Sequence, residues 1–152
     1  MNKTIYKYNL DIEKINKIRN FIRKQKYIKL AYLFGSYATK NQGYLSDIDI
    51  AFYLNPSLNK KQLFNKELFL RAKLNGILKT NKLIDVVIMN EAPTTLNFKI
   101  IKNGKILFEK DKDIRVDIET RIMSKYLDRR YYDKRYLNNF FRKVKIKGLI
   151  QK

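Results

Sequence analysis

The chain has 152 residues, 45% of them hydrophobic, so it is long and apolar enough to fold as one globular domain rather than remain disordered. It contains neither cysteine nor histidine, which excludes disulfides, thiolate chemistry, a histidine base and histidine-ligated zinc. The formal net charge of +20 indicates a field that attracts nucleotides, nucleic acids or an acidic protein, although a bias toward solvated lysines explains the charge equally well.

Alternating helical and strand patterns predict a chain of the α+β class. In chain order we expect a helix at 11–26, a strand at 27–34, a short helix at 36–40, a turn at 41–44, a strand at 47–54, a helix at 60–80, a strand at 82–89, a helix at 94–102, a turn at 103–104, a strand at 105–109 and a long helix from about 113 to 143. The expected buried stripe of helix 60–80 comprises Leu63, Phe64, Leu68, Ala72 and Leu74 or Ile77.

A single domain is expected over residues 1–152, with a core at about 11–111, a C-terminal helix at about 113–143 and a basic tail at 144–152. No signal-peptide pattern follows Met1, and no apolar run approaches the roughly 20 residues of a membrane span. We therefore expect a cytoplasmic protein without a membrane segment.

Two halves of a possible phosphate site lie close together in the sequence. An apolar run breaks at Gly35-Ser36, and ten residues later a second apolar run begins with Asp47 and Asp49. In a strand these two carboxylates project to the same face, while the isoleucine between them enters the core. Adjacent carboxylates repel each other unless a cation lies between them, and their oxygens suit a hard ion such as Mg2+.

The Gly-Ser pair supplies the complementary half. Gly35 permits a tight turn and close backbone approach, and Ser36 is suited to the N-cap of the short helix that follows. Free N–H groups at a helix start attract anions, so the two halves together indicate a metal-bridged triphosphate site. The structural alternative is that Ser36 is only a cap, and that Asp47 and Asp49 only mark an exposed strand start.

A third carboxylate, Asp85, interrupts the β-branched run of the strand at 82–89. An isolated charge in the core is very costly, so this side chain is not expected to be buried without a partner. If its strand lies beside the strand at 47–54, Asp85 joins Asp47 and Asp49 around the same metal ions.

This pattern, a Gly-Ser pair followed after ten residues by Asp-Ile-Asp, resembles the signature of the DNA polymerase β-like nucleotidyltransferase superfamily, particularly its minimal members. Within that group the chain is most similar to the MntA-type antitoxins, which are paired with a HEPN-domain toxin. The runs at 85–93 and 98–111 and the tyrosine-rich terminal helix carry this second resemblance. It implies a polymerase β-like core, built on a small mixed sheet flanked by helices, with a long C-terminal helix.

The resemblance also implies residue roles. Asp47, Asp49 and Asp85 would hold Mg2+, as two ions, and Gly35 and Ser36 would hold the β- and γ-phosphates of ATP. Relatives of this type transfer AMP to a tyrosine hydroxyl of the HEPN toxin, an RNase, and so silence it. The chain departs from many relatives in having Thr39-Lys40 where they place a glycine, which indicates a longer helix or a different hold on the nucleotide.

Three other functions remain open at this point. The chain could neutralise a toxin by occlusive binding alone, since its basic surface suits an acidic partner. It could transfer a nucleotide to a small molecule, although enzymes of that kind usually have an additional acceptor domain, for which this chain is short. It could act on RNA, because aromatics and cations interleave in the terminal helix; packing of these aromatics on the domain or on a partner is favoured over a nucleic-acid surface.

Overall fold

The computed structural model describes residues 10–39 and 46–147 of the chain. Its elements in chain order are α1 (Ile12–Arg23), β1 (Ile28–Phe34), α2 (Ser36–Thr39), β2 (Ile48–Leu54), α3 (Lys60–Leu78), β3 (Ile84–Ile88), α4 (Thr94–Asn103), β4 (Lys105–Glu109) and α5 (Lys112–Lys147). The α+β class is confirmed, and every expected helix and strand in the described ranges is present. The turn expected at 41–44 lies outside the described residues.

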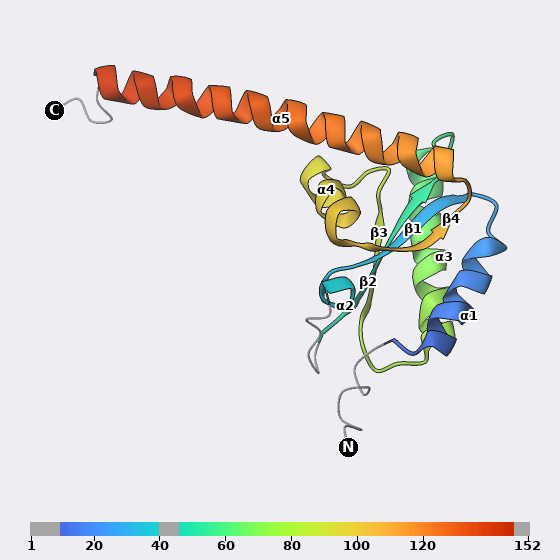
Figure 1. The fold of residues 1–152 in the computed structure, drawn as a ribbon. Helices are drawn as coiled ribbons and strands as arrows, with labels where there is room; N and C mark the ends of the chain where they lie inside the picture. The colour runs from blue at the N-terminus through green and yellow to red at the C-terminus, as the bar shows by residue number, and fades with distance from the viewer. Residues whose placement is uncertain (1–9, 40–45, 148–152) are drawn as a thin grey trace.

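The four strands form one mixed sheet in the order β3-β2-β1-β4. β1 pairs antiparallel with β2 and with β4, whereas β2 and β3 run parallel. A parallel pair needs a crossover connection, and α3 provides it (Figure 1). The expected small mixed sheet flanked by helices is therefore confirmed.

Helices cover both faces of the sheet. One core cluster joins strand residues such as Ile50 and Phe52 to buried residues of α1 and α3, and a second joins Leu30 and Ala51 to α4 and the first turns of α5. Because both faces are covered, β1 and β2 read as nearly continuous apolar runs rather than alternating ones.

The stripe that α3 buries differs from the expected one. Leu63 and Leu74 are buried as expected, but Phe64, Leu68 and Ala72 are exposed, the first two at 58% and 50%. Leu70 and Leu78 are fully buried in their place. Apolar residues occur around much of this helix, so periodicity alone does not fix which side faces the sheet. The start of α3 is well defined, because Asn59 and Gln62 form a reciprocal capping box.

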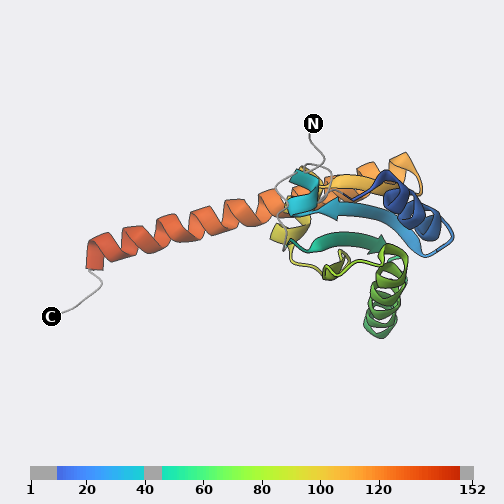
Figure 2. The same cartoon turned by 90° about the horizontal axis from the view of Figure 1, so that it is seen from below.

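α5 is longer than expected: it runs four residues past 143, into the region predicted to be a basic tail. Its first turns pack on the sheet, and the rest projects beyond the globular body as a single rod (Figures 1 and 2). None of the described helices combines the length and the apolarity needed to cross a lipid bilayer.

A buried polar network ties the packed end of α5 to the sheet. The hydroxyl of Tyr32, a residue of β1 that is 1% exposed, donates to Glu119 on α5. Arg115 pairs with Glu119 at 3.1 Å and also with Glu109 of β4. Burial and the neighbouring Glu119 carboxylate raise the pKa of Tyr32 above its ordinary value, so this phenol stays protonated and acts as a donor.

The chain offers a matched pair of tyrosines that tests this network. We expect Tyr32→Phe to lower the free energy of unfolding by about 1–2 kcal/mol, because Glu119 loses its buried donor. Tyr27 also has a buried hydroxyl, but no partner for it exists among the described residues, and burial raises its pKa to about 12. Tyr27→Phe should therefore leave stability unchanged or raise it. Urea unfolding of both variants makes the comparison, and equal losses would contradict it.

Candidate active site

The chain turns sharply after β1, at Gly35. Its φ of +67° lies in the left-handed region, which costs other residues roughly 1–2 kcal/mol. A Cβ at this position would also overlap Oδ2 of Asp49. Only glycine satisfies both conditions, so the predicted tight turn is present at Gly35. The group that its backbone approaches is the Asp49 carboxylate, and phosphate binding at this turn stays a prediction.

Ser36 is the first residue of α2 rather than its N-cap. The carbonyl of Gly35 accepts from the backbone N–H groups of Ala38 and Thr39, at 3.2 and 3.3 Å, so Gly35 holds the cap position. The hydroxyl of Thr39 also donates to the Gly35 carbonyl, at 3.3 Å. The next residue, 40, lies outside the described ranges.

The three predicted carboxylates occupy neighbouring positions at the end of the sheet where β2 and β3 begin, and we call this place the carboxylate edge. Asp47 is exposed and directly precedes β2, and Asp49 is the second residue of β2. Asp85 is the second residue of β3, and the parallel register places it directly opposite Asp49. Ile48 and Ile50 are buried on the other face, as the strand alternation predicted.

The carboxylates affect one another electrostatically. The pKa of Asp49 is raised, first by burial and then by the negative charges of Asp85 and Asp47. Negative charge is therefore concentrated at this point of the fold and is only partly compensated by the protein. A cation placed among the three carboxylates would relieve this repulsion.

Sequence reasoning missed one residue of the site, Arg71 on α3. Its Nη2 lies 3.6 Å from Oδ1 of Asp85 and 3.0 Å from Oε1 of Glu67, and it also donates to the Val86 carbonyl at 3.4 Å. Arg71 thus reaches around the open edge of β3 and holds one side of the Asp85 carboxylate. The only signal in the sequence is a Glu-Arg pair four residues apart, which is common on solvated helices.

A basic hollow lies beside Asp47. It has a volume of about 550 Å³ and is lined by three lysines, Lys14, Lys79 and Lys82, together with Asp47. Lys82 also lies over the ring of Tyr37, with its Nζ 5.1 Å from the ring centroid, which connects the start of β3 to α2. These lysines place positive charge next to the carboxylate edge, where phosphate groups would need it.

The donor set fits Mg2+ better than a softer metal. All three side chains offer carboxylate oxygens, and within the described ranges no three acidic groups converge tightly enough to enclose an ion by themselves. Mg2+ is usually held by one or two carboxylates and completes its octahedron with water and substrate phosphates. An open, one-sided arrangement of carboxylates suits this mode of binding.

Most of the aromatic residues of α5 do not pack on the domain. Tyr126 stacks on Phe98 of α4, with ring centroids 3.8 Å apart. Further along α5 the large apolar side chains are exposed, among them Tyr132, Tyr136 and Phe141 at 67%, 70% and 57%. The expected packing on the domain itself therefore holds only for the first turns of the helix.

Comparisons with known proteins agree with this geometry. The profile of the family described as "Polymerase beta, Nucleotidyltransferase" matches residues 16–113. A chain from a crystal structure of a toxin–antitoxin complex with AMP-PNP is 26% identical, with a TM-score of 0.64 over 87% of this chain and 99% of that one. A chain from the tri-AMPylated Shewanella oneidensis HEPN toxin in complex with its MNT antitoxin is 25% identical, with a TM-score of 0.60 over 85% and 97%. No curated protein sequence gives a significant match.

The family profile covers the segment from α1 to the start of α5, which includes Gly35, Ser36 and all three aspartates. The structural likeness extends over nearly the full length of the matched toxin–antitoxin chains. This chain belongs to the polymerase β nucleotidyltransferase family and is a nucleotidyltransferase.

Proposed function

We propose that this nucleotidyltransferase is an antitoxin that transfers AMP from ATP to a tyrosine hydroxyl of a cognate HEPN toxin and thereby neutralises it. The observation that carries the proposal is the cluster of Asp47, Asp49 and Asp85 at the sheet edge beside Gly35. The acceptor class is suggested by similar chains, which come from a complex with AMP-PNP and a complex with an AMPylated HEPN toxin.

In this proposal Asp47, Asp49 and Asp85 hold two Mg2+ ions. When bound there, the metal would supply positive charge to the phosphates and to the oxygens of an in-line displacement. The parallel register sets Asp85 opposite Asp49, and Arg71 pairs with one of the Asp85 oxygens. In the same proposal Asp85 would accept the proton of the attacking hydroxyl.

The chain's own backbone and lysines would position the nucleotide. Gly35 lets the turn approach the Asp49 carboxylate. In this proposal the backbone at Gly35 and Ser36 would hold the β- and γ-phosphates. The tyrosine oxygen then bonds to the α-phosphorus while the bond to the β-phosphate oxygen breaks, and pyrophosphate leaves with that electron pair. Catalysis depends mainly on positioning and on charge neutralisation.

The aspartates give the first test of this proposal. We expect Asp47→Asn and Asp49→Asn each to lower the rate of AMP transfer by roughly a hundredfold or more, because each removes a charge that holds the metal. The measurement is intact mass of the toxin after incubation with ATP and Mg2+. Asp113→Asn, an exposed position in the first turn of α5 at the other end of the sheet, is the matched control and should transfer AMP normally. Undiminished transfer by both site variants would refute the proposal.

Two glycines give a second test. Gly35→Ala should abolish transfer and destabilise the fold, because its Cβ overlaps the Asp49 carboxylate and its φ is unfavourable for alanine. Gly76→Ala is the matched control: no atom lies within 4 Å of its Cβ, and it stands inside α3, so this change should stabilise the protein by about 0.5–1 kcal/mol. Thermal unfolding and AMP transfer are measured on both. Normal transfer by Gly35→Ala would show that the turn does not serve the reaction.

A second candidate function, neutralisation by occlusive binding, is favoured by the exposed apolar residues of distal α5. An apolar helix that projects from the body suits a protein partner, and its many lysines and arginines suit an acidic one. Under either function the helix would bind the toxin.

We expect Phe140→Ser with Phe141→Ser to weaken toxin binding by about tenfold or more, because large buried aromatics dominate such interfaces. Stability of the free protein should change little, since both rings are exposed and contact mainly each other. Binding is measured by calorimetry, with Asn138→Ser and Asn139→Ser on the same turn as the control. Unchanged binding would place the toxin elsewhere. Toxin inhibition that survives in the Asp49→Asn variant would favour occlusion over catalysis.

A further inference from the structure

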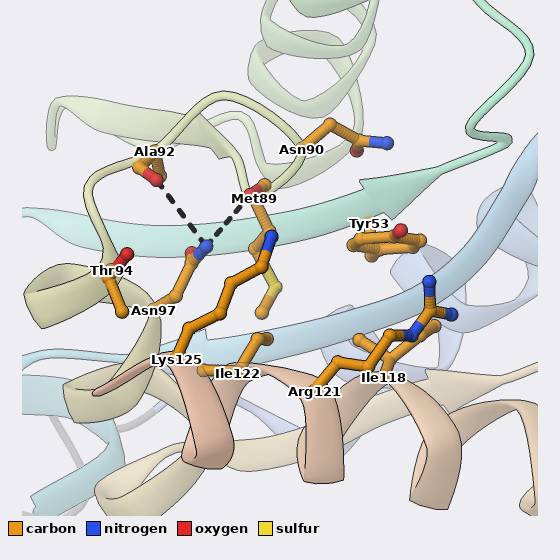
Figure 3. Close-up of a pocket in the computed structure, with 10 residues that line it drawn as sticks. All are labelled: Tyr53, Met89, Asn90, Ala92, Thr94, Asn97, Ile118, Arg121, Ile122 and Lys125. Atoms are coloured by element: carbon orange, nitrogen blue, oxygen red, sulfur yellow. Dashed lines mark hydrogen bonds between the residues drawn. The ribbon is translucent and has the colours of Figure 1, made fainter. Parts of the chain in front are cut away.

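A second pocket lies at the opposite end of the sheet from the aspartates. It is formed by the ends of β2 and β3, the start of α4 and the packed part of α5, and has a volume of about 150 Å³ (Figure 3). Tyr53, on its wall, is four residues along β2 from Asp49, which corresponds to roughly 13 Å. The fully buried Ala51 lies between them, so this pocket is separate from the candidate active site.

The floor of the pocket is apolar. Met89 comes from the end of β3, and Ile118 and Ile122 come from consecutive turns of α5; all three are buried, and Tyr53 stands beside them. The volume is close to that of a dry protein cavity that holds benzene. The floor therefore suits a ring or a branched alkyl group rather than a fully hydrated ion.

The rim of the pocket is positive. Arg121 and Lys125 lie one turn apart on α5, and both side chains extend across the pocket toward the strand ends (Figure 3). The first turn of α4 adds partial positive charge, because its N-cap is Pro93 and no side chain caps it. Arg121 already pairs with Asp117 at 2.8 Å, but both groups are largely exposed and the guanidinium retains further donors.

An unsatisfied acceptor lies within the wall. Asn97 is only 7% exposed, and its Nδ2 donates to the carbonyls of Met89 and Ala92, at 2.8 and 3.5 Å, which fixes the orientation of the amide. Its Oδ1 is buried, with no donor in the described part of the chain. Leaving such an acceptor unpaired is unfavourable, so a ligand whose N–H or O–H group reached the amide oxygen would gain a hydrogen bond.

We propose that this pocket binds a small organic oxyanion that has an apolar body and one hydrogen-bond donor. The apolar body would cover Met89, Ile118 and Ile122, the carboxylate or phosphate would meet Arg121 and Lys125, and the donor would serve the Asn97 amide oxygen. The proposal is independent of the nucleotidyltransferase reaction, because none of these residues belongs to the aspartate edge.

The methionines provide a site-specific measurement. The sequence has only three, and Met89 lines the pocket, whereas Met123 is 44% exposed on α5 and does not. In protein labelled at the methionine methyl groups, titration with 3-hydroxybenzoate should shift the Met89 signal and leave Met123 unmoved. Benzoate, which lacks the donor, should bind more weakly, and inorganic phosphate, which lacks the apolar body, should not shift Met89.

Paired variants locate the charge. Arg121→Gln with Lys125→Gln should weaken 3-hydroxybenzoate binding by at least about tenfold, whereas Arg129→Gln with Lys134→Gln, two exposed changes farther along the same helix, should leave it unchanged. The proposal is overturned if no probe shifts Met89, if both double variants bind alike, or if inorganic phosphate binds as well as the aromatic acids. A Met89 shift that appears only with the toxin would also overturn it, and would assign the pocket to an acidic side chain of that partner.

Discussion

The parallel pairing of β2 with β3 is the constraint on which the candidate active site depends. α3 carries the chain from the end of β2 back to the start of β3, so both strands begin at the same edge of the sheet. The register then sets Asp49 directly opposite Asp85, with Asp47 just before them. The fold thus brings like charges together, against their own repulsion, and the raised pKa of Asp49 is the result.

The raised pKa of Asp49 determines whether its ionisation stabilises or destabilises the fold. A carboxyl group whose pKa is higher in the folded chain than in the unfolded chain destabilises the fold when it is ionised, and that cost disappears as the pH falls through the raised pKa. A divalent cation among the carboxylates acts in the same direction at neutral pH, because it replaces repulsion with attraction. The carboxylate edge is therefore a place where the fold forgoes some stability, as functional sites commonly do.

The sequence predicted the parts of this site that depend on local geometry. The two-residue period of a strand places Asp47 and Asp49 on one face, and glycine alone tolerates the conformation at residue 35. Strand order, in contrast, depends on contacts between distant segments, so the place of Asp85 was conditional on its strand lying beside β2. Arg71 could not be found at all, because its role arises only when the packed α3 carries it to the edge of β3.

The helices show the same difference between features that local sequence determines and features that packing determines. Their number and approximate ends follow from periodicity and capping residues, whereas the face they bury depends on the surface they meet. In α3, apolar residues occur on several sides, and only the packed structure selects Leu70 over Phe64 and Leu68. In α5, the apolar pattern continues well past the last contact with the domain, and within residues 10–39 and 46–147 nothing covers this part of the helix.

The direction of α5 connects the two proposed roles of the protein. In both views the distal half of the helix leaves the body on the side where α2 lies (Figures 1 and 2), and α2 follows the Gly35 turn beside Asp49. A protein bound along this half of the helix would have to extend past α4 to reach the carboxylate edge, because α5 crosses the opposite end of the sheet (Figure 1). Binding of the toxin along this helix would present a toxin tyrosine for AMP transfer and would also shield the surface of the bound toxin. Loss of toxin activity is therefore common to both functions, and only covalent modification that depends on the aspartates separates them.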